Sequence, residues 1–287
     1  MRLQRIFSNG WLVGLRVEVD QDFDAESDAD PTADDVELDE IYGYVSTPWG
    51  RIEIGEQDGP ADTFALHAPT VGTGQIRGDF ARYAGSVARL KPFDSQDTFK
   101  VIYLSPPIGG LRFGASWGPE LRVNPTNPDP RRRTLQSDPI EFAAQYQTPI
   151  NDKMVLAISG AYVTANSNPI TGREDIDSWS IGAEARWNKL RLGGAYVVRG
   201  DSNAAFGRDE EEFNAGASWR EEKWTIASSY AHITRFGSSR NLYGLGGSFR
   251  LTKNLILRSD FVVFDEKFIS GNTRNGTVAL VDLRVRY

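Results

Sequence analysis

The chain of 287 residues contains no cysteine, so disulfide bonds and thiolate metal sites are excluded. No apolar run approaches the length of about 18 residues that a membrane-spanning helix requires. Basic residues are fewer than acidic ones, with 32 Lys and Arg against 39 Asp and Glu, which gives a net charge of −7. Such an acidic chain is a poor candidate for binding nucleic acid. An aromatic content of 11% excludes a disordered chain.

Hydrophobic residues recur at every second position through most of the chain, which is the period of a β-strand. The segment 177–188, DSWSIGAEARWN, places its Trp, Ile and two Ala residues on one face and its Ser, Gly, Glu and Arg residues on the other. Only residues 77–91 show any helical periodicity. The sequence therefore predicts an all-β protein that forms a single domain over 1–287.

The alternation predicts fourteen complete strands, at 10–21, 37–47, 50–58, 96–106, 109–119, 138–149, 152–165, 177–188, 189–199, 210–220, 222–235, 241–252, 254–265 and 276–287. Short turns alternate with longer polar connections, which lie at 22–36, 59–95, 120–137, 166–176, 200–209, 236–240 and 266–275. An antiparallel up-and-down sheet with short turns at one end and long loops at the other produces this alternation. A sandwich with Greek-key crossings does not.

Two architectures fit alternating strands, and they differ in which face the apolar residues occupy. A transmembrane barrel turns them toward lipid, and it needs strands of about 9–11 residues. A soluble, secreted all-β ligand-binding protein turns them inward, and its strands cluster near about 5–6 residues. The predicted strands are long, and their polar face carries Arg, Asp and Glu residues that are costly in a packed core. The pattern thus favours the transmembrane barrel over the soluble alternative.

The seven tryptophans gather at the ends of the predicted strands. Five of them lie next to short turns (Trp11, Trp49, Trp187, Trp219 and Trp224), and two lie near the long connections (Trp117 and Trp179). Because indole combines an apolar ring with a polar N–H, it favours a boundary between water and hydrocarbon. Two such groups are typical of the aromatic girdles of a membrane barrel.

Three segments resemble general Gram-negative porins, particularly the alphaproteobacterial type. Residues 39–46 (DEIYGYVS), the Pro-Trp-Gly turn after them and residues 50–58 (GRIEIGEQD) resemble a strand–turn–strand region of that family. Residues 59–95 resemble its constriction loop. The last residues, 281–287 (VDLRVRY), resemble the outer-membrane signature, in which alternating apolar residues end on an aromatic residue.

The resemblance implies a homotrimer of 16-stranded barrels in the Gram-negative outer membrane. Each barrel is expected to be a water-filled channel for passive diffusion of small hydrophilic solutes and ions, with outer-membrane lipid and lipopolysaccharide as neighbours. It implies neither a cofactor nor enzymatic activity. Only residues 2–7 remain to form a descending strand before the turn at 8–10, and no apolar signal segment follows Met1. We therefore expect the signal peptide and the first one to two strands to be missing, while a barrel closed at fourteen strands stays open as an alternative.

Side-chain parity assigns several charged residues to the lumen. Those of the predicted pore wall near the constriction are Arg16, Glu18, Glu40, Arg51, Glu53 and Arg112. Further residues of the same parity are Tyr42, Tyr44, Glu184, Arg186, Arg191, Arg258, Asp260, Asp282, Arg284 and Arg286. In porins a basic wall faces an acidic loop, which implies constriction roles for Asp58, Asp62, Asp79 and Asp94. The loop also carries basic residues, so the sequence does not decide the ion selectivity.

Two charged segments allow further interpretations. The acidic run from Asp20 to Asp39 could hold structural calcium, because oxygen-rich loops suit hard cations, but its spacing does not match an EF-hand. A solvated external loop is the favoured interpretation. Segment 120–137 carries three consecutive arginines, 131–133, and is predicted to be a basic external loop that could attract anions or lipopolysaccharide.

The only histidines, His67 and His232, leave one enzymatic alternative, an outer-membrane barrel hydrolase. Ser228 shares a strand face with His232, but four positions along a strand separate them by about 13 Å. The sequence contains no nucleophile elbow, phosphate-binding loop or metalloprotease motif. The porin interpretation is therefore preferred to an enzyme.

Overall fold

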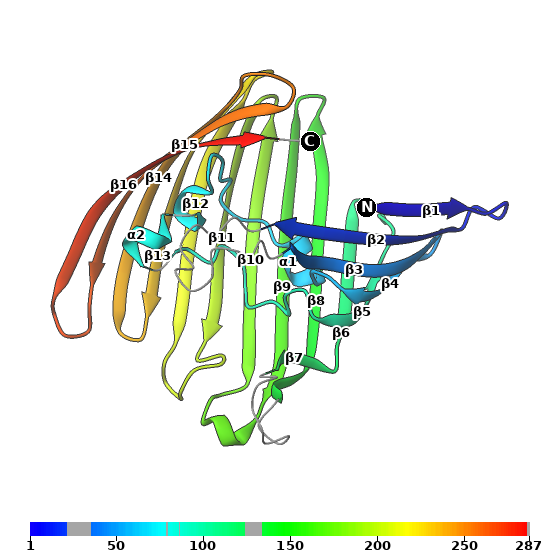
Figure 1. Cartoon of the computed structure of the whole chain (residues 1–287), viewed down its shortest axis with the longest axis horizontal. Coiled ribbons are helices and arrows are strands. Elements are labelled where there is room, and N and C mark those ends of the chain that lie inside the picture. Colours follow the sequence, from blue (N-terminus) through cyan, green and yellow to red (C-terminus); the bar gives the residue numbers. More distant parts are fainter. Residues whose placement is uncertain (22–35, 79, 86, 124–133, 286–287) are drawn as a thin grey trace.

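A computed structural model of the chain describes residues 1–21, 36–78, 80–85, 87–123 and 134–285. These residues form one antiparallel sheet, called the wall below, in which neighbouring strands in the sequence are neighbours in space. The wall curves strongly and has a convex outer face and a concave inner face (Figure 1). No helix in the described part of the chain is long and apolar enough to cross a membrane.

The sixteen strands within the described residues follow the period-two pattern of the sequence. They are β1 (Arg2–Ile6), β2 (Leu12–Gln21), β3 (Val36–Thr47), β4 (Gly50–Glu56), β5 (Phe99–Leu104), β6 (Leu111–Trp117), β7 (Glu120–Val123), β8 (Thr134–Asn151), β9 (Met154–Ser167), β10 (Ile176–Trp187), β11 (Leu190–Gly200), β12 (Glu210–Arg220), β13 (Trp224–Arg235), β14 (Ser238–Arg250), β15 (Leu255–Lys267) and β16 (Thr273–Val285). The short helices are α1 (Pro60–Phe64), η1 (Gln75–Arg77), α2 (Ala81–Ala84) and η3 (Pro169–Thr171).

The count of sixteen strands agrees with the fourteen predicted complete strands and their stub. β6 and β7 pair with successive parts of β8, so they form one strand of the wall that is interrupted at Gly118 and Pro119. β1 pairs with β2 and is the stub that the sequence predicts. The hydrogen-bonded path from β1 to β16 therefore has fifteen positions, and among the described residues no pairing joins its two ends.

The predicted alternation of short and long connections is wrong at one place, and two of the predicted long connections are shorter than expected. β13 and β14 are joined by Phe236 and Gly237 alone, both at positive φ (52° and 73°), which is the conformation of a tight hairpin turn. β15 and β16 are joined by residues 268–272. The predicted external loop 120–137 is also too wide, because β7 and the start of β8 lie inside it and only 124–133 fall outside the described residues. Strand pairing extends further than the polar composition indicates.

The wall presents its apolar residues on the convex face, as the membrane-barrel interpretation requires. Leu15 is 39% exposed and Ile181 is 59% exposed, whereas Glu184 on the opposite face of β10 is 4% exposed. The soluble alternative, which places these apolar residues inside, is therefore wrong. An apolar outer surface with a polar inner surface is the pattern of a barrel embedded in lipid.

The strand register gathers the tryptophans into two bands. Leu190 pairs with Trp187 on one side and with Trp219 on the other, close to the short turns. Near the other end of the strands, the rings of Trp179 and Tyr196 lie 5.9 Å apart. All seven tryptophans are exposed. Their placement matches the two predicted girdles.

The connection between β4 and β5, residues 57–98 and called the inner loop below, crosses the concave face of the wall (Figure 1). It carries α1, η1 and α2. Near its start, Ala61 and Phe64 pack with Val163 and Ile176 of the wall. Farther along, Ile76, Phe80 and Leu90 join an apolar cluster with inward-facing wall residues, which are Ala231, Ile233, Leu242, Val262 and Phe264. Burial of these side chains holds the loop inside the curve of the wall.

Gly182→Val should displace the inner loop from the wall. A Cβ at Gly182 would lie 2.0 Å from the carbonyl oxygen of Leu66, so backbone must move. We expect limited proteolysis of the refolded protein to cleave residues 57–98 about tenfold faster than in the unchanged chain.

The matched control is Gly160→Val, whose nearest atom beyond its chain neighbours is the carbonyl oxygen of Ser180 at 3.9 Å. This variant should be cleaved at the rate of the unchanged chain. Equal cleavage of the two variants would show that close packing of Leu66 on β10 does not hold the loop.

Candidate functional site

Three inward-facing carboxylates of the wall accept hydrogen bonds from the backbone of the inner loop. Glu141 on β8 accepts from the amides of Ala61 (2.9 Å) and Ser95 (2.7 Å). These two residues lie near the start and the end of the loop. All of these groups are buried, so each bond satisfies a backbone N–H that water cannot reach.

Glu212 and Asp260 do the same at two other parts of the loop. Glu212 on β12 accepts from the amides of Arg89 (2.6 Å) and Leu90 (2.9 Å). Asp260 on β15 accepts from the amides of Thr73 (2.9 Å) and Gln75 (2.8 Å). Because a carboxylate can accept several N–H bonds at once, three side chains fix the loop over most of its length.

Smaller wall residues complete these attachments. Ser159 accepts from the amide of Leu66 (2.9 Å), and Asn214 accepts from that of Ala68 (2.8 Å). The glycines Gly182, Gly193 and Gly216, on three neighbouring strands, leave room for the loop backbone at 66–69. The small residues of the polar face therefore make space for the loop.

The part of the wall that the inner loop leaves open carries arginines stacked on tyrosines. The guanidinium of Arg51 lies 3.8 Å from the ring centre of Tyr44, and that of Arg16 lies 5.9 Å from the ring centre of Tyr42. Arg2 donates a hydrogen bond to the Tyr44 hydroxyl (3.0 Å). Stacking on aromatic rings limits the movement of these long side chains, so their charges stay at defined places.

The arginines of this part of the wall also pair with wall carboxylates. Arg16 pairs with Glu18, and its Nε lies 3.3 Å from a carboxylate oxygen of Glu40. Arg51 pairs with Glu53. Positive and negative charges are therefore interleaved on the same strands, and the simple arrangement of a basic wall against an acidic loop does not describe this region.

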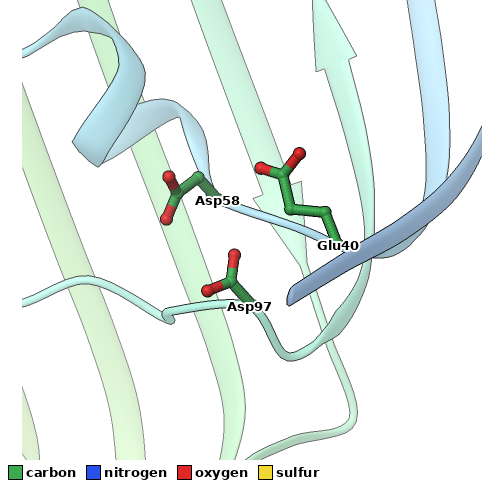
Figure 2. A group of neighbouring side chains, drawn as sticks. All are labelled: Glu40, Asp58 and Asp97. Carbon is green, nitrogen blue, oxygen red and sulfur yellow. The ribbon is translucent and has the colours of Figure 1, made fainter. Parts of the chain in front are cut away.

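Three carboxylates meet where the inner loop leaves and rejoins the wall. Glu40 of β3, Asp58 after β4 and Asp97 before β5 point toward one another, with oxygen atoms within 4.8 Å (Figure 2). Since calcium takes about six to eight oxygen ligands, the three oxygens form a region of negative potential rather than a complete cation site.

Removal from bulk water and mutual repulsion change the ionisation of this cluster. Partial burial, together with the charges of Asp62 and Asp97, raises the pKa of Asp58 to about 7. Partial burial and the charge of Asp39 raise the pKa of Asp97 as well. The charge of Asp58 therefore depends on pH near neutrality.

The remaining predicted constriction residues have different surroundings. Asp62 pairs with Lys91 inside the loop. Asp94 lines a cavity near the end of the loop. Arg112 donates to Gln145 (2.6 Å) and lies over the ring of Phe64. Asp79 lies outside the described residues.

Five of the other residues assigned to the lumen by parity form ion pairs on the wall. Glu184 pairs with both Arg186 and Arg191, and Arg258 pairs with Asp282. Tyr42 and Tyr44 are buried against their arginines, Arg284 is exposed, and Arg286 lies outside the described residues.

The sequence interpretation missed the most important attachments of the inner loop. Glu141 and Glu212 were not singled out, although both have the inward parity of their strands. The available signal was a carboxylate on the polar face in the middle of a wall strand, as in the segment EFAAQ around Glu141. Their partners are backbone amides, which no residue pattern marks.

The charged segments and the histidines add no second site within the described residues. Most of the acidic run, 22–35, and the arginines at 131–133 lie outside the described residues. His67 lies in the inner loop, where burial lowers its pKa. The ring of His232 contacts Asn241 (2.8 Å) and lies on the convex face, because its neighbours Ala231 and Ile233 are buried on the concave one. The two histidines are thus on opposite faces of the wall.

Comparisons with known proteins agree with this architecture. A family model described as Gram-negative porin matches residues 2–267. No curated protein matches the chain significantly. Among solved structures, the anion-selective porin from Comamonas acidovorans aligns at 16% identity over 99% of this chain and 86% of that one, with a TM-score of 0.63. A triple mutant of Rhodopseudomonas blastica porin aligns at 17% identity over 98% and 88%, with a TM-score of 0.62.

Glu212→Leu should loosen the inner loop around residues 89–90. The substitution leaves two backbone amides without their acceptor, and we expect the free energy of unfolding to fall by about 2 kcal/mol or more. Hydrogen exchange at Arg89 and Leu90, measured with urea unfolding, tests this.

Glu211→Leu is the matched control because Glu211 is adjacent in sequence but exposed on the outer face, where it accepts from the Tyr196 hydroxyl. Its expected effect on the unfolding free energy is about 0.5 kcal/mol or less. If the two variants lose equal stability, Glu212 does not hold the loop.

Proposed function

The chain belongs to the Gram-negative porin family, and we propose that its inner loop and the arginine–tyrosine part of the wall enclose the narrowest section of the channel. The protein is an outer-membrane porin, a passive channel for small hydrophilic solutes and ions. Porins act on their solutes by width and electric field and carry out no reaction.

One observation supports the placement of the constriction. The inner loop is attached to β8, β12 and β15 on the concave face, whereas the arginines and tyrosines of β1 to β4 line a hollow of their own. We propose that a solute in the channel passes between these two surfaces.

The proposed constriction residues fall into two groups. Arg16, Arg51 and Arg112 supply positive charge on the wall. Carboxylates supply negative charge at the ends of the inner loop and beside them, which are Glu18, Glu40, Glu53, Asp58, Asp62 and Asp94. Several of these carboxylates are paired with the arginines. We therefore propose an electric field that changes sign over short distances, which orients polar solutes and excludes neither anions nor cations.

We further propose that the protein works as a homotrimer surrounded by lipopolysaccharide. Family membership supports the trimer, and the exposed aromatic bands support the lipid contact.

Refolded protein in planar bilayers should produce stepwise, ohmic increases in conductance. A trimer should close under voltage in three equal substeps, because each insertion then carries three channels. Properly folded protein that produces no ohmic step would contradict the channel proposal. Closure in a single step would contradict the proposal of a trimer.

Cation preference should rise with pH between about 6 and 8. With a pKa of about 7, Asp58 is about one tenth ionised at the lower pH and about nine tenths ionised at the higher one. The added negative charge attracts cations, so the reversal potential in a KCl gradient should shift toward that of a cation-selective channel.

Asp58→Asn should remove this step, whereas Asp152→Asn, in an exposed short turn, should retain it. If Asp58→Asn and the unchanged chain shift alike with pH, another group causes the titration and Asp58 does not face the solute path.

A further inference from the structure

A second basic region lies away from the arginine–tyrosine part of the wall. It is a cavity of about 530 Å³ between the inner loop and the ends of β11, β12 and β13. Seven basic and two acidic side chains are among the described residues that line it. The cavity therefore carries a strong positive charge inside a chain whose net charge is −7.

Three of these arginines share one carboxylate. Glu210, the first residue of β12, is 7% exposed. Its oxygens lie 2.9 Å from Nε of Arg235, 3.5 Å from Nε of Arg89 and 3.8 Å from Nη1 of Arg199. Three positive charges around one negative charge leave an excess of two.

Strand pairing and the inner loop bring the three arginines together. Arg235, the last residue of β13, pairs directly with Glu210. Arg199 lies next to Gly200, which pairs with Glu210 from the other side. Arg89 comes from the inner loop, where Glu212 fixes its backbone amide. The cluster is thus assembled from elements that the fold holds in place.

Aromatic rings orient two of the guanidinium groups. Arg199 lies over the ring of Phe93 at 4.5 Å, and Arg235 lies over that of Phe236 at 4.8 Å. The Nε atom of Arg199 is buried without a hydrogen-bond partner, whereas Nε of Arg235 faces Glu210. Stacking occupies the faces of the guanidinium groups and leaves N–H groups at their edges, which is the geometry that binds oxyanions through paired hydrogen bonds.

We propose that this cavity binds a small divalent oxyanion of the phosphate type, as a free ion or as the charged group of a solute. The excess of two positive charges matches the charge of such a dianion, and guanidinium forks match its oxygen atoms better than they match chloride. The cavity is lined by the inner loop, by strand ends and by the connections 168–175 and 201–209, away from the apolar outer face, so the ligand comes from the aqueous side. This inference rests on the proposed channel function, because the site holds solute that then enters the channel.

Isothermal titration of the refolded full chain with inorganic phosphate, in detergent and excess sodium chloride, tests the site. The unchanged chain should bind phosphate saturably despite the chloride. Arg89→Gln should weaken this affinity about tenfold, because a charged hydrogen bond is lost. Arg89 is a loop residue whose side chain is 41% exposed, so its replacement should leave the fold intact.

Two further variants sharpen the result. Arg250→Gln, at the exposed end of β14, makes the same charge change far from the cavity and should keep the affinity of the unchanged chain. Glu210→Gln removes the competing carboxylate and should tighten phosphate binding, which a merely structural role for Glu210 does not predict. Phosphate binding no stronger than that of chloride, or equal weakening by Arg89→Gln and Arg250→Gln, would overturn the proposal.

Bilayer recordings separate this inference from the channel proposal. Phosphate should reduce the chloride current of the unchanged chain and reduce it less in Arg89→Gln. A chain that conducts but responds to phosphate in neither experiment refutes the anion site alone. A chain that binds phosphate but does not conduct refutes the channel and leaves the site standing.

Discussion

The structure depends on hydrogen bonds from the backbone of the inner loop to carboxylates on the wall. A loop of this length inside a barrel must find partners for its own N–H groups, since helices and sheet satisfy few of them. Glu141, Glu212 and Asp260 supply these partners from three separate strands. A buried carboxylate is costly by itself, and the loop amides are equally costly without an acceptor. Each therefore requires the other, and the loop position follows from the wall.

This pairing also explains why the fold was more predictable than the site. Strand positions came from side-chain parity, which the sequence displays directly, and the outward exposure of Leu15 and Ile181 agrees with it. The attachments of the loop could not be predicted, because their donors are backbone amides of residues such as Ala61 and Leu90 that have no distinctive side chain. The sequence predicts a longer loop at 236–240, whereas the structure has a two-residue turn at Phe236 and Gly237. The ends of the adjoining strands are polar and therefore resemble a loop.

One part of the site does follow from topology. The two ends of a loop that joins adjacent antiparallel strands must lie side by side, and Glu56 pairs with Phe99 at this base. Asp58 and Asp97 lie two residues beyond these positions, so they must meet. Glu40 joins them because β3 pairs with β4 along the same edge. The raised pKa of Asp58 is thus a consequence of connectivity as much as of local composition.

The same geometry explains how one loop carries fields of opposite sign. Its acidic residues Asp58 and Asp97 belong to the ends, which topology confines near β4 and β5, whereas Arg77 and Arg89 belong to the part that reaches the far strands. Charges that are mixed in the sequence are therefore sorted in space by the path of the chain. Successive sections of the proposed solute path have different signs, so the net charge of the loop or of the whole protein says little about the field that acts on a solute. A solute with both an anionic and a cationic group can be oriented by such a sequence of fields, which a uniformly charged lumen cannot do.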